Sequence, residues 1–184
     1  MGTATPPQAV KLFVGLISGR SLLFEEAAEA LADLFGPIEI VSPFYPWNHT
    51  DYYQDELGKD LKRQFLFFKE SISPDGLSEI KEKTNELEQR WATATASGLL
   101  RPINLDPGYL TPSKVVLATT KDFAHRVYLK KGIYAEVTLI YRGRSFEPLS
   151  HTYPDFRTQE YIELFNRVRA SFMKSLASAG PHRK

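Results

Sequence analysis

The stretch VKLFVGLISGRSLLFEEAAEALADLFGPIEIV, residues 10–41, decides the fold class that we expect. Residues 10–17 form a nearly continuous apolar run with β-branched members, which predicts a buried strand. Apolar residues within 22–35 recur at helical spacing, and Gly36-Pro37 ends that helix in the usual order, glycine before proline. Residues 38–41 then begin a second strand. This strand–helix–strand opening is typical of a ferredoxin-like unit.

Further along the chain, the pattern predicts two more helices and a tight turn. Ser73-Pro74-Asp75 begins a helix that continues to about Trp91, and a last helix covers about residues 158–176. Between them, Asn104–Tyr109 carries proline and glycine where a type II turn needs them.

Two strands, 125–129 and 133–141, predict a hairpin with a three-residue loop at Lys130–Gly132. That register gives the hairpin one apolar and one polar face. On the polar face Arg126 lies opposite Glu136. The two form either a functional ion pair or the ordinary polar side of a half-exposed sheet. The apolar face would pair Leu129 with Ile133 and Val127 with Ala135.

Length and composition are those of a globular domain. The 184 residues are 42% hydrophobic and 24% charged, close to the averages for folded proteins. We expect a single α+β domain over residues 10–176, with residues 1–9 and 177–184 as flexible tails. The domain should have two layers, an antiparallel or mixed sheet packed against about three helices.

Charge and cysteine content exclude several classes of function. A net charge of +1 provides no overall field to recruit nucleic acid or a membrane surface. The chain has no cysteine, which excludes disulfides, thiol catalysis and cysteine-ligated zinc. Residues 1–7 lack the features of a secretory signal, and no apolar run approaches the length of a membrane span. We expect a cytoplasmic protein.

One candidate site is the segment Gly15–Ser21, between the first strand and the first helix. A phosphate-binding Walker loop has the pattern Gly-x-x-x-x-Gly-Lys-Ser/Thr. Here the spacing is one residue short and Arg20 replaces the lysine. A weaker form of the hypothesis keeps Arg20 and the helix N-terminus as an anion site. The alternative is an ordinary turn in which Ser21 caps the helix.

The histidines are a second source of candidates. His49 and Asp51 point to the same side of an extended segment, and His125 lies at a strand start. Imidazole and carboxylate groups can serve as a general acid or base, or hold a divalent metal. For a metal, His49 and Asp51 would be the ligands, although no fixed-spacing motif supports one. Local side-chain to backbone bonds in the loop are the alternative.

Two other segments are open to more than one interpretation. Asp155 and Arg157 could clamp a ligand, or they could cap the last helix and pair with each other. The aromatic segment Phe44–Tyr53 could be a docking surface for a partner protein, since Trp and Tyr dominate interface anchors. RNA binding near Lys130 and Lys131 is a lesser variant without a family motif.

Several blocks of the sequence resemble a prokaryotic domain-of-unknown-function family catalogued under the number 4416. The likeness covers nearly all of residues 10–175 and implies a full-length single-domain protein, without implying a function. Some members are labelled "GTP-binding protein", but this chain lacks both a proper Walker loop and the Asn-Lys-x-Asp guanine motif. The similar blocks are residues 11–18, 48–53, 104–110, 121–128, 132–136 and 152–157.

These blocks are rich in charged and aromatic polar residues, which packing alone rarely requires. The resemblance therefore favours a polar site. We expect binding of a phosphorylated small molecule or nucleotide, with a hydrolase-type reaction as one form of it; the alternative is the non-catalytic interaction module. The catalytic candidates are His49, Asp51 and His125, and the ligand-binding candidates are Arg20, Asp106, Lys121, Arg126, Glu136, Asp155 and Arg157.

Overall fold

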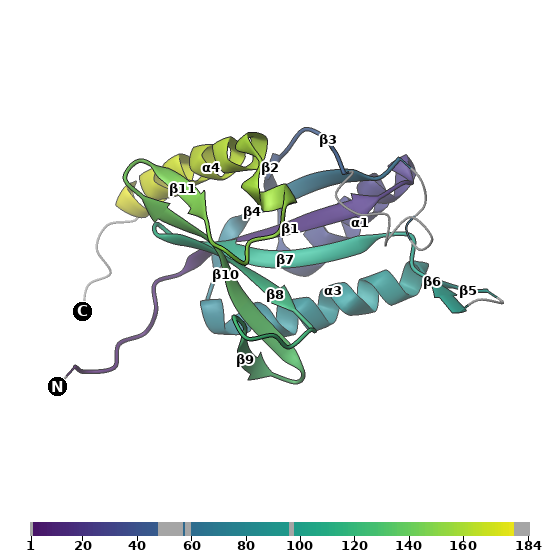
Figure 1. The fold of residues 1–184 in the computed structure, drawn as a ribbon, viewed down its shortest axis with the longest axis horizontal. Helices are drawn as coiled ribbons and strands as arrows, with labels where there is room; N and C mark the ends of the chain where they lie inside the picture. Colours follow the sequence, from purple (N-terminus) through teal and green to yellow (C-terminus); the bar gives the residue numbers. More distant parts are fainter. Residues whose placement is uncertain (1, 48–56, 58–59, 96–97, 179–184) are drawn as a thin grey trace.

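The computed structural model describes residues 2–47, 57, 60–95 and 98–178 (Figure 1). The chain begins with the strand–helix–strand order predicted from residues 10–41. The main elements of its first part are β1 (Val10–Ser18), α1 (Ser21–Phe35), β2 (Ile38–Val41), β4 (Lys62–Ile72), α3 (Leu77–Trp91) and β7 (Asn104–Leu110). A short strand β3 (Tyr45–Pro46), a 3-10 turn η2 (Pro74–Gly76) and a small hairpin of β5 (Thr93–Thr95) and β6 (Gly98–Leu100) lie between them.

These elements form the ferredoxin-like unit that the sequence predicts. In space the strands follow the order β7-β1-β4-β2, and each neighbouring pair is antiparallel. β4 therefore lies between β1 and β2, the two strands that α1 connects. Gly36, with φ 89°, ends α1 as expected for a glycine beyond the last helical turn. The helix begins at Ser21 without a side-chain cap, so the predicted cap is wrong.

The second part of the chain extends this sheet and adds a helix. The elements are β8 (Lys114–Thr119), β9 (Val127–Lys130), β10 (Ile133–Arg142), β11 (Ser145–Pro148), the 3-10 turn η3 (Asp155–Arg157) and α4 (Gln159–Ser178). β8 pairs with β7, and β10 pairs with β8, β9 and β11. The result is an antiparallel sheet of nine strands with helices, which confirms the α+β class.

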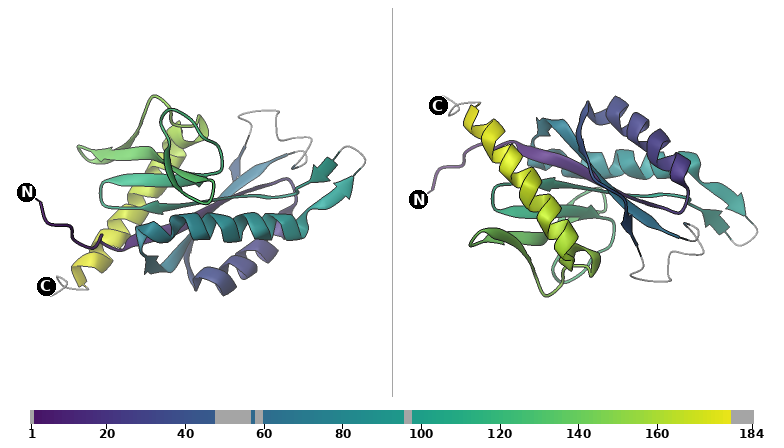
Figure 2. Two further views of the ribbon diagram at one scale, coloured as in Figure 1. Left: turned by 90° about the horizontal axis from the view of Figure 1, so that it is seen from below. Right: turned by 90° about the horizontal axis from the view of Figure 1, so that it is seen from above.

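Helices cover both faces of the sheet, so the domain has three layers where two were predicted. Leu12, Val14 and Leu16 of β1 pack with α1 and α3, whereas Phe13 packs with α4. The two views of Figure 2 look onto these opposite faces. A strand covered on both sides is mostly apolar, and β1 is buried along its whole length, with Lys11 and Ser18 as its polar members.

The predicted turn at Asn104–Tyr109 is wrong, because these residues form strand β7. Pro107 and Gly108 lie opposite Val14 and Phe13 of β1. Gly108 is needed there for space: a Cβ atom would lie 2.4 Å from the carbonyl oxygen of Val116 and 2.6 Å from the ring of Phe13. Tertiary packing has overridden the turn-forming preference of the Pro-Gly pair.

β8 covers only the second half of β7. The pairing between them begins at Gly108 and extends to Leu110. At Leu105 the open edge is satisfied from α3: the backbone N–H donates to Glu88 Oε1 at 2.7 Å, and the carbonyl oxygen accepts from Lys81 Nζ at 2.8 Å. Two buried side chains thus take the place of a neighbouring strand.

The β9–β10 hairpin is tighter than predicted. Lys130 pairs with Ile133 across a two-residue turn, in which Lys131 (φ 54°) and Gly132 (φ 75°) are both left-handed. A bulge at Leu129 restores the predicted pairs further along, Val127 with Ala135 and Tyr128 with Tyr134. The apolar face expected from β9 is not buried, since Val127 is 68% exposed.

None of the helices in the described ranges is both long enough and apolar enough to cross a membrane.

Replacing Gly108 by alanine should strongly destabilise the fold. The new methyl group would collide with a strand backbone on one side and a buried ring on the other, which should lower the free energy of unfolding by at least about 2 kcal/mol. Gly76→Ala is the matched control, because nothing lies within 4 Å of its added Cβ and its φ of −71° suits alanine. Urea denaturation checks both variants. Equal stability of the two would contradict the close approach at Gly108.

Candidate functional site

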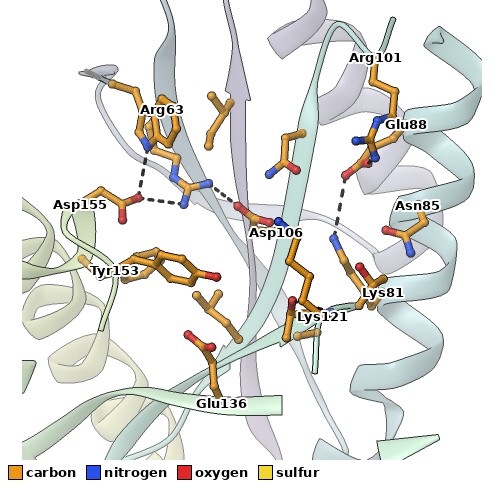
Figure 3. Close-up of a pocket in the computed structure, with 18 of the residues that line it drawn as sticks. Arg63, Lys81, Asn85, Glu88, Arg101, Asp106, Lys121, Glu136, Tyr153 and Asp155 are labelled. Carbon is orange, nitrogen blue, oxygen red and sulfur yellow. Dashed lines mark hydrogen bonds and ion pairs between the residues drawn. The ribbon is translucent and has the colours of Figure 1, made fainter. Parts of the chain in front are cut away.

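A cavity of about 950 Å³ opens where β8 has left β7 (Figure 3). Its walls come from the start of β7, the end of β8, α3, β10 and the segment around η3. The lining contributes four cationic and four anionic side chains, namely Arg63, Lys81, Arg101, Lys121, Glu88, Asp106, Glu136 and Asp155. Such a concentration of charge in one concave site is typical of ligand recognition.

Arg63 holds one side of the cavity together. It is 3% exposed, and its guanidinium donates to Asp106 at 2.8 Å and to Asp155 at 3.2 Å. It also lies over the rings of Phe65 and Phe156, with centroid distances of 5.2 and 5.6 Å. These contacts link β4, β7 and η3 at a single buried cation.

Gly15 leaves room for the Arg63 side chain on the sheet. A Cβ atom on Gly15 would lie 3.1 Å from Arg63 Nη1, and Gly15 is the cross-strand partner of Asp106. Gly15 therefore serves the packing of Arg63 in the middle of β1. It is not part of a loop that could wrap a phosphate, so the Walker-like interpretation of Gly15–Ser21 is wrong.

The pKa values of the ionisable groups around Arg63 are set by burial and by their charged partners. Burial raises the pKa of Asp106, but the charges of Arg63 and Lys81 outweigh it and leave that pKa below its usual range. For Arg63, burial lowers the pKa and the two aspartates more than compensate, so the guanidinium stays charged. Burial also raises the pKa of the Tyr161 hydroxyl nearby.

The α3 wall carries a second buried ion pair. Lys81 and Glu88, two helical turns apart, face the cavity with a 4.0 Å separation between Nζ and Oε1. Burial raises the pKa of the Glu88 carboxyl, and Lys81 and the bond from the Leu105 amide offset only part of this. Arg101 approaches the same carboxylate to 3.7 Å with a side chain that is 44% exposed. Lys81 and Glu88 are thus occupied with the edge of β7, while Arg101 extends toward solvent.

On the opposite wall, Glu136 is the centre of a polar cluster. Its Oε2 accepts from Arg126 Nε at 2.7 Å and lies 3.2 Å from His125 Nε2. Arg126 also donates to the Tyr153 hydroxyl at 2.6 Å and to the Lys121 backbone carbonyl at 2.9 Å. The predicted Arg126–Glu136 contact is therefore confirmed. Its setting is not the exposed face of a sheet, since Glu136 is 2% exposed.

Tyr153 lines the cavity beside this cluster, whereas His125 lies behind it. Burial raises the pKa of Tyr153, more than Arg126 lowers it, so the phenol is neutral near pH 7, and Figure 3 shows its hydroxyl pointing into the cavity. His125 stacks on His151 with a centroid distance of 4.2 Å. It lies behind Glu136 and is not part of the lining.

Of the predicted site residues, four line this cavity: Asp106, Lys121, Glu136 and Asp155. Arg126 lies directly behind them. Sequence reasoning missed Arg63, Lys81, Glu88, Arg101 and Tyr153. A signal was available for Lys81 and Glu88, whose spacing of seven puts both on the inner side of an otherwise apolar helix stripe.

Other predicted residues are not brought to the cavity. Arg157 braces its own turn by donating to the carbonyls of Thr152 and Ser150, both at 2.7 Å. It does not pair with Asp155, whose partners are Arg63 and Trp47. Arg20 is exposed and absent from the lining.

His49 and Asp51 lie outside the described residues, so their roles as acid, base or metal ligands stay predictions. Within the ranges that the structure describes, no three His, Asp or Glu side chains gather in a way that could hold a metal ion.

The aromatic segment 44–53 is described only as far as Trp47. Tyr45 packs on Tyr161 at 5.0 Å between ring centroids, and Trp47 is 7% exposed. Phe44 packs on Phe24 at 4.9 Å. Tyr45 and Trp47 pack into the protein's own interior, whereas Phe44 is 49% exposed. Residues 48–53 lie outside the described ranges, so the docking-surface hypothesis stays a prediction.

The Arg63 cluster generates a prediction about pH. We expect Asp106→Asn to lower the free energy of unfolding by about 1–3 kcal/mol at pH 7, because buried Arg63 loses one of its two carboxylates. The pKa of Asp106 is lowered in the folded state, so its contribution is complete above the unfolded value near 4 and is lost as the pH falls through the lower folded value. The difference between the two proteins should therefore shrink below about pH 4.

Urea titrations from pH 7 to pH 2 measure this difference. Glu79→Gln is the control, since it removes an exposed partner of Lys130 and should have a much smaller effect. A gap between wild type and Asp106→Asn that stays constant over the whole range would refute the assignment.

Comparison with known proteins agrees with the fold but adds no activity. No curated protein and no solved structure gives a significant match. The model of one family, a domain of unknown function (DUF4416), matches residues 8–172. This range contains every charged residue of the cavity and all the strands of the sheet. By this match the chain belongs to the DUF4416 family.

Proposed function

We propose that the protein binds a small phosphorylated molecule, such as a nucleotide or a sugar phosphate, in the cavity between β7, β8 and α3. The observation that carries the proposal is the position of Lys121. Its side chain lines the cavity, and within the described residues its ammonium has no carboxylate partner. A phosphate would supply that partner.

The balance of charge supports an anionic ligand. Asp106 and Asp155 are held by Arg63, Glu88 lies between Lys81 and Arg101, and Glu136 is held by Arg126. Each carboxylate of the lining therefore already has a cation from the protein. Lys121 remains as an added positive charge in the lining. A multiply charged phosphate would be attracted to this cation over neutral molecules of the same size.

Size and shape also suit a ligand of this kind. Small-molecule sites usually occupy about 300–1,000 Å³ and combine apolar walls with a few fixed polar groups. Trp47, Phe156 and the Tyr153 ring provide the apolar surface, and Asn85, Asn104 and Thr119 add neutral polar groups. We propose binding and not a specific hydrolysis, because His125 lies behind Glu136 and the other catalytic candidates are outside the described ranges.

Ligand screening by thermal shift tests the proposal directly. Nucleotides and sugar phosphates are added to the full chain, and a ligand at about 100 times its dissociation constant should add about 2.7 kcal/mol of stability. For the best ligand, Lys121→Met should weaken binding by at least about tenfold, because one charge-assisted hydrogen bond is lost.

The control is Lys174→Met, which removes an exposed lysine on α4 that is not part of the cavity. It should bind as tightly as wild type. Isothermal titration calorimetry gives the dissociation constants. If no phosphorylated compound binds, or if Lys121→Met and Lys174→Met weaken the ligand equally, the proposal fails.

A further inference from the structure

The two oxygens of the Glu136 carboxylate differ in their surroundings. Oε2 has two close partners, Arg126 and His125. Oε1 is buried, and no donor among the described residues lies within hydrogen-bond distance of it. In this carboxylate, Oε2 is held by protein partners and Oε1 has none among the described residues.

This difference has an energetic meaning. Arg126 is held at 2.7 Å from Oε2, which fixes the position of the whole group. A buried acceptor without a donor costs about 1–3 kcal/mol, more when it is charged. Such groups are rare in folded proteins and often belong to sites that a ligand completes.

The unsatisfied oxygen belongs to the same cavity as Lys121. Glu136 is part of the lining, and in Figure 3 its carboxylate points inward below Tyr153, on the β10 side, while Arg101 and Glu88 lie on the α3 side. Arg126 ties the Glu136 carboxylate to the backbone at Lys121, since it donates to Oε2 and to the backbone carbonyl of Lys121. The unsatisfied carboxylate oxygen and the Lys121 ammonium therefore belong to neighbouring parts of one cavity lining.

From this arrangement we infer that the ligand is bifunctional: it carries an N–H donor, such as an amino group, that binds Glu136 Oε1, in addition to the anionic group that binds Lys121. The inference rests on the proposed function and narrows its substrate class to aminated phosphate compounds. Glu136 is then the residue that distinguishes an aminated ligand from a plain phosphate ester. An acceptor that only a suitable donor can satisfy is a strong source of discrimination.

Matched probe pairs test this inference on the full-length protein. The probes are 2-aminoethyl phosphate against ethyl phosphate, and 4-aminobutyl phosphate against butyl phosphate. Choline phosphate is the third probe, because it keeps the positive charge but has no N–H to donate. Calorimetry should give at least about tenfold tighter binding for an aminated probe than for its alkyl partner, with choline phosphate close to the alkyl probes.

Two variants assign the preference to its residue. Glu136→Gln keeps the shape of the side chain and should reduce the ratio of aminated to alkyl phosphate affinity to within about twofold. Lys121→Met should weaken both members of a pair at least about tenfold and leave their ratio unchanged. If Glu136→Gln does not fold, the wild-type comparison of aminated, alkyl and quaternary probes still decides the question.

The results separate the two proposals. Equal binding of aminated and alkyl phosphates to wild type would overturn the role of Glu136 and leave the phosphate site standing. Tight binding of choline phosphate would also overturn it, because charge without a donor would then suffice. Failure of every phosphate to bind, aminated or not, would overturn the proposed function itself.

Discussion

The open edge of β7 is the constraint on which the site depends. A strand in a sheet must satisfy its backbone groups on both sides. β8 satisfies the backbone groups of β7 only from Gly108 onward. At Leu105 the side chains of Lys81 and Glu88 on α3 bind the backbone groups instead. Since α3 supplies side chains in place of a backbone, it stands further from β7 than a strand would. The space between them is the beginning of the cavity.

Arg63 converts this space into a defined site. A buried guanidinium is costly unless its charge is matched. Two aspartates from distant parts of the chain match the charge of Arg63, while its Nε has no hydrogen-bond partner among the described residues. Because Asp155 precedes α4 by a few residues, the same ion cluster also fixes where the chain crosses to the other face of the sheet. One interaction therefore positions a cavity wall and begins the layer that covers the second face.

The polar groups of the cavity divide into those already bound and those still open. Arg63, Lys81 and Arg126 each have protein acceptors close by, so they maintain the architecture. Lys121 and Glu136 Oε1 have no such partners within the described residues. In the proposed function one ligand would partner both groups, the exposed ammonium of Lys121 and the buried Oε1 of Glu136.

The sequence by itself determined the ferredoxin-like opening, the last helix and four of the acidic or basic residues that meet in the cavity. Local signals carry these features: the buried run of β1, the helical stripe of α4 and the Gly-Pro end of α1. Other features were decided only by tertiary structure. Pro107-Gly108 favours a turn locally, yet it lies in a strand because β7 pairs with β1 and β8. Phe13 and Val116 leave room there for nothing larger than glycine. Likewise, the local sequence indicates that Arg63 is an ordinary strand residue. Only the folded structure brings it into contact with two aspartates, one 43 and the other 92 positions away. Contacts over such separations depend on how whole elements pack, and no local pattern in the sequence encodes them.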